Sequence, residues 1–177
     1  MGRNLAIALL LVISLVAQGR IGDSRKGLVE RFGAPVAEEN DPQGIVDTIL
    51  AFEKHGVTIR AGIIEDVCVK IVYKKLELFT DAEAIELLRA NSKFEDMGDW
   101  SMDKSKKYHV NDAVFIRYEE RYDPKRKPEK GKEDVKWDAK ATFKWNTLTI
   151  VTKAYEGAEL STLLKKKSGM SEKLKDF

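Results

Sequence analysis

The chain has 177 residues, of which 31 are Lys or Arg, 29 are Asp or Glu and 43% are hydrophobic. A chain of this length folds as one compact domain or two very small ones, and its balanced charge excludes a strongly acidic or basic disordered tail protein. The net charge of +2 is too small to steer the protein toward a polyanion by itself.

The first residues have the form of a secretory signal peptide. Arg3 supplies a positive charge, Leu5 to Ala17 is an uncharged apolar run, and Ala17-Gln18-Gly19 presents small residues where signal peptidase reads them. The apolar run is shorter than the roughly 20 residues that span a bilayer. We therefore expect cleavage after Gly19, which removes residues 1–19 and leaves a periplasmic or secreted protein without a transmembrane helix. A membrane anchor formed by a retained signal is the alternative.

The mature chain opens with a predicted short helix. Asp23 or Ser24 caps its start, and Gly33 followed by Pro35 ends it. Its apolar stripe consists of Leu28, Val29 and Phe32.

Three predicted strands follow this helix. Apolar and polar residues alternate over 57–63 and again over 67–73, which is the period of a β-strand. Glu65-Asp66 joins these two runs, and residues 49–54 precede them across His55-Gly56, a dipeptide suited to a tight turn. The first part of the chain is therefore predicted to be a helix followed by a three-stranded meander.

The same order of elements is predicted a second time. Thr80 and Glu83 form a capping box that begins a helix. Strand-like alternation follows at 114–119 and 135–144, and a third strand is predicted at 148–155. A last short helix carries three leucines, Leu160, Leu163 and Leu164.

The predicted fold class is α+β, with two tandem units after the signal peptide. Residues 20–78 form the first helix plus three-stranded antiparallel meander, and residues 79–177 form the second, with a short C-terminal helix and a Lys-rich tail. Each sheet is expected to bury one face under its helix and to leave the other solvated or shared.

The helix that runs from Gly22-Asp23-Ser24 to Arg31-Phe32-Gly33-Ala34-Pro35 and precedes a meander resembles the SmpA/BamE-type envelope domain and the related β-lactamase-inhibitor-protein-like tandem repeats. Tyr73-Lys74-Lys75, Leu87-Leu88-Arg89-Ala90-Asn91 and Trp100 are similar to motifs of small exported bacterial proteins within that group. The resemblance implies a binding or accessory role in the cell envelope and supplies no catalytic residue. BamE-type proteins are usually lipoproteins, and this chain lacks the lipid-bearing cysteine.

Catalytic and metal-binding motifs are not predicted. His55 and His109 have no second His or Cys at ligand spacing, so no metal site and no cofactor are expected. Cys68 shares a predicted strand face with Lys70, which would lower the pKa of its thiol, whereas a half-buried structural cysteine is the favoured interpretation. An enzyme that uses Cys68 and a histidine brought near by folding is the second alternative function.

A group of basic residues on a loop and the neighbouring strand is the one feature of the sequence that indicates a binding site. The loop carries Lys125, Arg126, Lys127, Lys130 and Lys132, and the neighbouring strand face carries Lys136, Lys140 and Lys144. Trp137, Phe143 and Trp145 are assigned to the opposite, core-side register, so base stacking and a nucleic-acid signature are not indicated. A solvated loop whose lysines protect a sheet edge from aggregation explains the same residues.

The favoured function is a non-catalytic exported bacterial envelope protein that binds an envelope or extracellular protein partner through a sheet face or the loop at 123–134. The first alternative is a domain that binds a polyanion, such as anionic lipid or polysaccharide, through the basic residues 125–132. If the basic edge is not the contact, the expected surface is the face of the first meander around Thr58, Arg60, Cys68 and Lys70, whose mixed polarity is typical of a protein interface.

Overall fold

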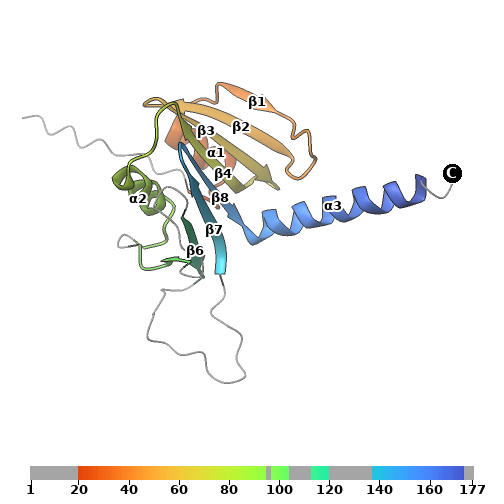
Figure 1. Ribbon diagram of the computed structural model, residues 1–177. Helices are drawn as coiled ribbons and strands as arrows, with labels where there is room; N and C mark the ends of the chain where they lie inside the picture. The colour runs from red at the N-terminus through yellow and green to blue at the C-terminus, as the bar shows by residue number, and fades with distance from the viewer. Residues whose placement is uncertain (1–19, 95–96, 104–112, 120–136, 174–177) are drawn as a thin grey trace, which may run out of the picture.

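The computed structural model describes residues 20–94, 97–103, 113–119 and 137–173 (Figure 1). The expected signal peptide at 1–19, His109, the basic residues at 125–132 and Lys136 lie outside the described residues.

The described part of the chain is built on one antiparallel sheet of eight strands. Each half of the chain supplies a helix and then four strands. The first half contains α1 (Arg25–Phe32), β1 (Ala37–Glu39), β2 (Thr48–Lys54), β3 (Val57–Ile64) and β4 (Val67–Lys75). The second contains α2 (Asp81–Ala90), β5 (Trp100–Met102), β6 (Val114–Tyr118), β7 (Trp137–Lys144), β8 (Thr147–Thr152) and the terminal helix α3 (Lys153–Lys173).

The two halves meet in the middle of this sheet. The strand order is β1-β2-β3-β4-β8-β7-β6-β5, so the last strand of each half pairs with the last strand of the other. In the register between them Lys70 lies opposite Val151, and Lys74 lies opposite Thr147.

The expected fold, two units that each hold a three-stranded meander, is wrong. Within the described residues each half has four strands, and all eight belong to one sheet. The missed strands β1 and β5 are only three residues long, which is too short for an alternating pattern to stand out. Pairing of β4 with β8 joins segments far apart in the sequence, and no local pattern encodes such a pairing.

The predicted starts of the first two helices are confirmed. The side chain of Ser24 accepts a hydrogen bond from the backbone N–H of Gly27, 3.2 Å away, at the start of α1. Thr80 and Glu83 form the expected capping box at the start of α2. Gly33 ends α1 with φ of 89°, a conformation that glycine adopts without a steric cost.

The two predicted hairpin turns in the first half are also confirmed. His55 and Gly56 have φ of 50° and 75°, and Glu65 and Asp66 have φ of 49° and 64°. Positive φ at both central residues gives the twist that a two-residue hairpin needs. These turns connect β2 with β3 and β3 with β4.

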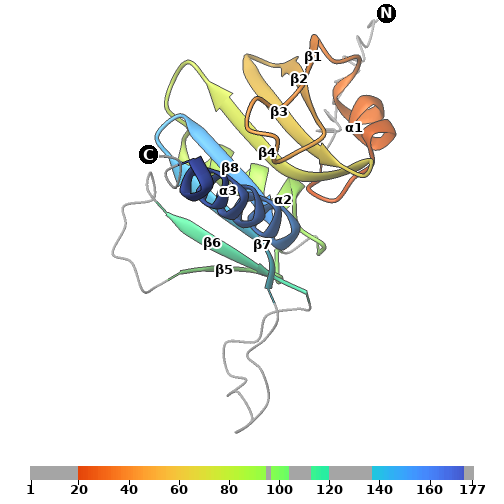
Figure 2. The same cartoon turned by 90° about the vertical axis from the view of Figure 1, so that its right-hand side faces the viewer.

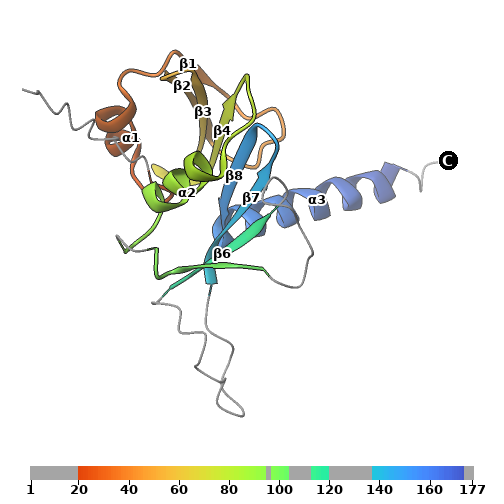
Figure 3. The same cartoon turned by 60° about the vertical axis from the view of Figure 1, so that its left-hand side comes forward.

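One face of the sheet is covered by α1 and α2, which come forward in Figure 3. The fully buried side chains between these layers include Leu28, Leu50, Phe52, Ile71, Leu88, Phe143, Leu148 and Ile150. We call this the helix-covered face. It contains the main hydrophobic core.

A buried asparagine connects four parts of the helix-covered face. Asn91, at the end of α2, accepts a hydrogen bond from the N–H of Ile21 (2.9 Å) and donates to the carbonyl of Leu87 (2.8 Å). Its amide also donates to the hydroxyl of Tyr73 on β4 (3.1 Å). Arg117 on β6 donates to the backbone carbonyl of Asn91 (2.6 Å). Asn91 thus joins both halves of the sheet to the segment that precedes α1.

The last helix is longer than expected and projects away from the sheet (Figures 1 and 2). It begins at Lys153, so the expected strand at 148–155 ends earlier, at Thr152. Tyr155 is buried and Ala158 packs against the same cluster. No helix within the described residues has both the length and the apolar character that a membrane crossing needs.

The three tryptophans occupy different environments. Trp100 is buried on β5. Trp137 is half-buried, and the ammonium group of Lys153 lies 4.9 Å from its ring centroid. Trp145 is 59% exposed with φ of 56°, so its assignment to the core side is wrong. The reason is that β7 ends at Lys144, and Trp145 stands in the turn where strand alternation no longer applies.

Candidate functional site

The opposite face of the sheet carries polar and basic side chains. The residues that alternate with the core positions on the central strands form this surface, which we call the open face: Thr58, Arg60, Lys70, Val72, Lys74, Lys140, Thr142, Lys144, Thr147, Thr149 and Val151. Figure 2 shows α3 projecting in front of β7 and β8, and Tyr155 at the start of α3 contacts Lys70 of the open face. Neither α1 nor α2 covers these strands on this side (Figure 3).

Four lysines mark out a rectangle on the three central strands. Lys70 and Lys140 both lie opposite Val151, and Lys74 and Lys144 both lie opposite Thr147. Neighbouring strands are about 4.8 Å apart and residues rise about 3.3 Å each, so the rectangle measures about 10 Å across the strands and about 13 Å along them. We call these four residues the lysine rectangle.

The interior of the lysine rectangle carries no charge. It consists of half-buried Val72, Thr142, Thr147, Thr149 and Val151. Within the described residues, Lys74, Lys140 and Lys144 make no ion pair, whereas Arg60 pairs with Glu39 at 2.7 Å. The lysine rectangle therefore presents basic side chains around a floor of methyl and hydroxyl groups.

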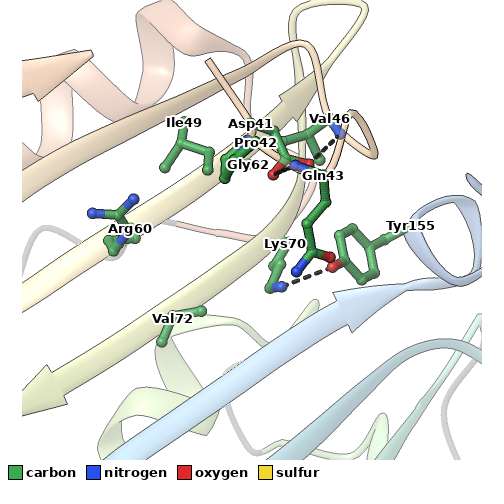
Figure 4. A pocket seen from close by; sticks show the side chains of 10 residues that line it. All are labelled: Asp41, Pro42, Gln43, Val46, Ile49, Arg60, Gly62, Lys70, Val72 and Tyr155. Carbon is green, nitrogen blue, oxygen red and sulfur yellow. Dashed lines mark hydrogen bonds between the residues drawn. The ribbon is translucent and has the colours of Figure 1, made fainter. Parts of the chain in front are cut away.

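The corner at Lys70 is held by the terminal helix. The Lys70 ammonium donates a hydrogen bond to the hydroxyl oxygen of Tyr155, 2.8 Å away, and lies 4.5 Å from the centroid of that ring. Figure 4 shows the Gln43 side chain pointing toward this pair. Tyr155 belongs to a second, smaller hydrophobic cluster with Val46 and Val69.

A pocket of about 220 Å³ lies beside Lys70 (Figure 4). It is lined by Asp41, Pro42, Gln43, Val46, Ile49, Arg60, Gly62, Lys70, Val72 and Tyr155. Its lining thus combines apolar side chains with the charged groups of Asp41, Arg60 and Lys70 and the amide of Gln43.

Asp41 fixes the loop that forms one wall of the pocket. Its carboxylate accepts hydrogen bonds from the backbone N–H groups of Gln43 (3.0 Å), Ile45 (2.7 Å) and Val46 (3.1 Å). Burial alone would raise the pKa of Asp41, but these backbone hydrogen bonds outweigh it and hold the pKa below its ordinary value. The carboxylate is thus engaged within the loop and kept in its charged form.

The structure brings together only part of the residues that the sequence singled out. Lys140 and Lys144 lie on the open face, and Lys125, Arg126, Lys127, Lys130, Lys132 and Lys136 lie outside the described residues. Thr58, Arg60 and Lys70 of the first half share the open face with Lys140 and Lys144. Lys74 completes the group, and its spacing of four residues from Lys70 on one strand face is the sequence signal that connects it with the other lysines.

Cys68 does not belong to the open face, contrary to the expectation that it shares a strand face with Lys70. The register of β3 and β4 shifts between Gly62 and Ile63, so Cys68 turns into the core while Lys70 faces outward. The thiol is fully buried, and burial raises its pKa to about 12. It donates a hydrogen bond to the Lys70 carbonyl, 3.4 Å away. A reactive thiolate is therefore not favoured at this position.

In the part of the chain that the structure describes, no three His, Cys, Asp or Glu side chains come together as a metal site would require. His55 lies in the tight turn between β2 and β3.

No protein-family model matches the chain, and no curated protein matches it in sequence. Solved structures with a partial likeness include an extracellular protein containing an SCP domain from Bacillus anthracis str. Ames, at TM-score 0.38 and 10% identity over 76% of this chain. Another is a cysteine-rich secretory protein from Staphylococcus aureus subsp. aureus Mu50, at TM-score 0.37 and 13% identity over 75% of this chain. The chain spans only 44% of the length of each of these proteins.

These findings correct the expected resemblance to SmpA/BamE-type or β-lactamase-inhibitor-protein-like domains. The structures that match are described as SCP-domain and cysteine-rich secretory proteins, and the chain matches no family model. The motifs behind the resemblance, a capped short helix with a Gly-x-Pro stop and a meander, are local structural signals that many folds share. At these TM-scores the likeness carries no argument about function.

Proposed function

We propose that the chain is an exported, non-catalytic binding protein whose open face holds an acidic surface of a protein partner. The observation that carries this proposal is the lysine rectangle: Lys70, Lys74, Lys140 and Lys144 surround an uncharged floor on the three central strands. Charge complementarity of this kind favours carboxylate-bearing partners and sets the orientation in which they bind.

The rigidity of the central strands supports the proposal. β4, β8 and β7 are each paired on both sides, so the stems of the four lysines start from fixed positions. Less side-chain and backbone freedom is then lost on binding than if the lysines stood on a loop. A partner with carboxylates about 10 Å or about 13 Å apart would meet two lysines at once.

The floor and the pocket favour a protein over a small molecule. Half-buried threonine and valine side chains between the lysines offer apolar contact together with hydroxyl groups, a mixture that is typical of protein interfaces. The pocket of about 220 Å³ beside Lys70 is below the range of about 300 to 1,000 Å³ usual for small-molecule sites. It is of a size to take one side chain of the partner.

An anionic lipid surface or polysaccharide is the second candidate, because Lys74, Lys140 and Lys144 lack ion pairs within the described residues. Such a ligand would be held almost wholly by charge, so its binding would fall steeply as salt rises. A partner that also contacts the uncharged floor would retain part of its affinity at high salt.

The test is capture of partners by the immobilised mature chain from envelope and extracellular fractions of the native source. The variant carries Lys74→Glu, Lys140→Glu and Lys144→Glu, and the control carries the same charge change at exposed positions elsewhere, Lys26→Glu, Lys165→Glu and Lys166→Glu. We expect one protein to be retained by the wild type and the control and lost from the variant, and to bind again when purified. Equal capture by all three, or retention of polysaccharide or lipid alone, would contradict the proposal.

Export is tested separately, since it rests on the pattern of residues 1–19. N-terminal sequencing of the protein from its native source should begin at Arg20. A chain that still begins at Met1 would contradict cleavage.

A further inference from the structure

The outer part of α3 has an apolar stripe with nothing packed against it in the described structure. Leu160, Leu163 and Leu164 are 59%, 57% and 58% exposed. Tyr155 and Ala158, on the same helix, belong to the smaller hydrophobic cluster against the sheet. At 100° per residue, Leu163, Leu160 and Leu164 lie about 80°, about 140° and about 180° around the helix from Tyr155, and Ala158 lies about 60° to the other side of Tyr155. The stripe therefore points away from the sheet, on the part of the helix that projects in Figure 1.

Charged residues stand at both ends of this stripe. Glu156 precedes the leucines and Lys167 follows them. Counted from Tyr155 at 100° per residue, Glu156 and Lys167 lie about 100° and about 120° around the helix, so they lie on the same side of the helix as the leucines. From the start of the helix outward, the stripe thus runs from Glu156 through the three leucines to Lys167.

We propose that the stripe is covered by the same stripe of a second copy of this chain, in an antiparallel helix pair. The twofold axis would pass between Ser161 and Thr162, because this point is midway between Leu160 and Leu163 and also midway between Glu156 and Lys167. Leu160 of each copy then lies beside Leu163 of the other, and Glu156 beside Lys167.

Charge selects this arrangement over a parallel one. In the antiparallel pair the twofold axis creates two Glu156–Lys167 contacts between the copies. A parallel pair would place Glu156 beside Glu156 and Lys167 beside Lys167, and like charges at such positions are destabilising. The twofold pairing also closes on itself, so assembly stops at two copies.

The size of the stripe predicts a weak dimer. Three leucines on each helix bury less than the roughly 1,200 to 2,000 Å² of a stable interface. The dimer should therefore form only as the protein concentration rises into the micromolar range or above. The inference stands apart from the proposed function, since it uses no residue of the lysine rectangle.

The first test is sedimentation velocity of the full mature chain over a concentration series from low micromolar to millimolar. The wild type should pass from monomer to dimer without larger species. Leu160→Ser with Leu163→Ser should remain monomeric, whereas Leu78→Ser, which changes an exposed leucine outside α3, should dimerise like the wild type. A monomeric wild type at every concentration, or a dimer unaffected by the two serines, would overturn the proposal.

The second test exchanges the charges. Glu156→Lys and Lys167→Glu should each raise the dimer Kd at least about fivefold, because each creates two like-charge contacts. The double variant restores opposite charges and should return the Kd close to that of the wild type. Circular dichroism checks that the helix is retained. Failure of the double variant to recover dimerisation would overturn the antiparallel register.

Discussion

The ammonium group of Lys70 and the hydroxyl oxygen of Tyr155 lie 2.8 Å apart, so one corner of the lysine rectangle is fixed by the first turn of α3. The same tyrosine fills the smaller hydrophobic cluster between the sheet and the helix. The lysine rectangle and the terminal helix are thus connected through one side chain.

Substitutions of Tyr155 should separate its two roles. Tyr155→Phe keeps the ring and removes the hydrogen-bond acceptor of Lys70, which should lower the free energy of unfolding by about 1 kcal/mol. Tyr155→Ala also removes the ring from its cluster and should cost roughly 3 to 5 kcal/mol. Urea unfolding followed by circular dichroism measures both. Equal losses for the two variants would show that the ring contributes little to packing.

Asn91 should be among the polar residues least tolerant of change. Asn91→Ala removes the acceptor of the Ile21 N–H and the donor to the Tyr73 hydroxyl, both in buried surroundings, so we expect a loss of roughly 2 to 4 kcal/mol in unfolding free energy. Asn40→Ala, at an exposed position, is the control and should cost no more than about 0.5 kcal/mol. A similar small loss at both positions would contradict the connecting role of Asn91.

The start of α2 should lose stability in acid. A hydrogen bond from Lys75, followed by those from Thr80, lowers the pKa of Glu83 from 4.5 to about 2. Because the folded pKa lies below the unfolded one, this stabilisation is complete above pH 4.5 and is lost as the pH falls from there toward about 2. The urea midpoints of the wild type and Glu83→Gln should therefore differ at neutral pH and converge across that window. A difference that does not change with pH would contradict the assignment.

Cys68 should resist thiol reagents while the protein is folded. Burial raises the pKa of its thiol to about 12, so little thiolate exists at mildly alkaline pH, and the sulfur is also shielded from the reagent. Labelling with Ellman's reagent should be slow in buffer and fast in urea. In Thr149→Cys, the new thiol on the open face should react quickly while Cys68 stays unlabelled. Fast labelling of the wild type in buffer would show that the buried position is wrong.

Local features of the fold could be predicted from the sequence because they depend on neighbouring residues. Ser24 and the Thr80–Glu83 pair cap helices through bonds that span three residues, and His55-Gly56 closes a two-residue hairpin. Such signals are complete within a short stretch of chain. The three-residue strands β1 and β5 have too few positions to show an alternating pattern. The start of α3 was missed because it lies inside a segment whose pattern also predicts a strand.

The candidate site could be predicted only in part, because local patterns show which residues share a strand face but not which strands pair. The alternation of Lys140 and Lys144 on one strand, and of Lys70 and Lys74 on another, is visible in the sequence. Their union in the lysine rectangle depends on the pairing of β4 and β7 with β8, which is a long-range contact. The register shift beside Gly62 turns Cys68 into the core, and its local signal is a glycine inside a strand pattern, which often marks a bulge.

Photo-crosslinking from single positions tests the central claim, that the open face binds the partner, most directly. A benzophenone maleimide is attached at Thr149→Cys, in the middle of the lysine rectangle, or at Ile85→Cys, an exposed position on α2 on the other side of the sheet. The buried Cys68 leaves the new thiol as the reactive one. After illumination with the fraction that contains the captured partner, the account predicts a crosslink to that protein from position 149 and none from position 85. Crosslinks from position 85 alone, or equally from both, would contradict it.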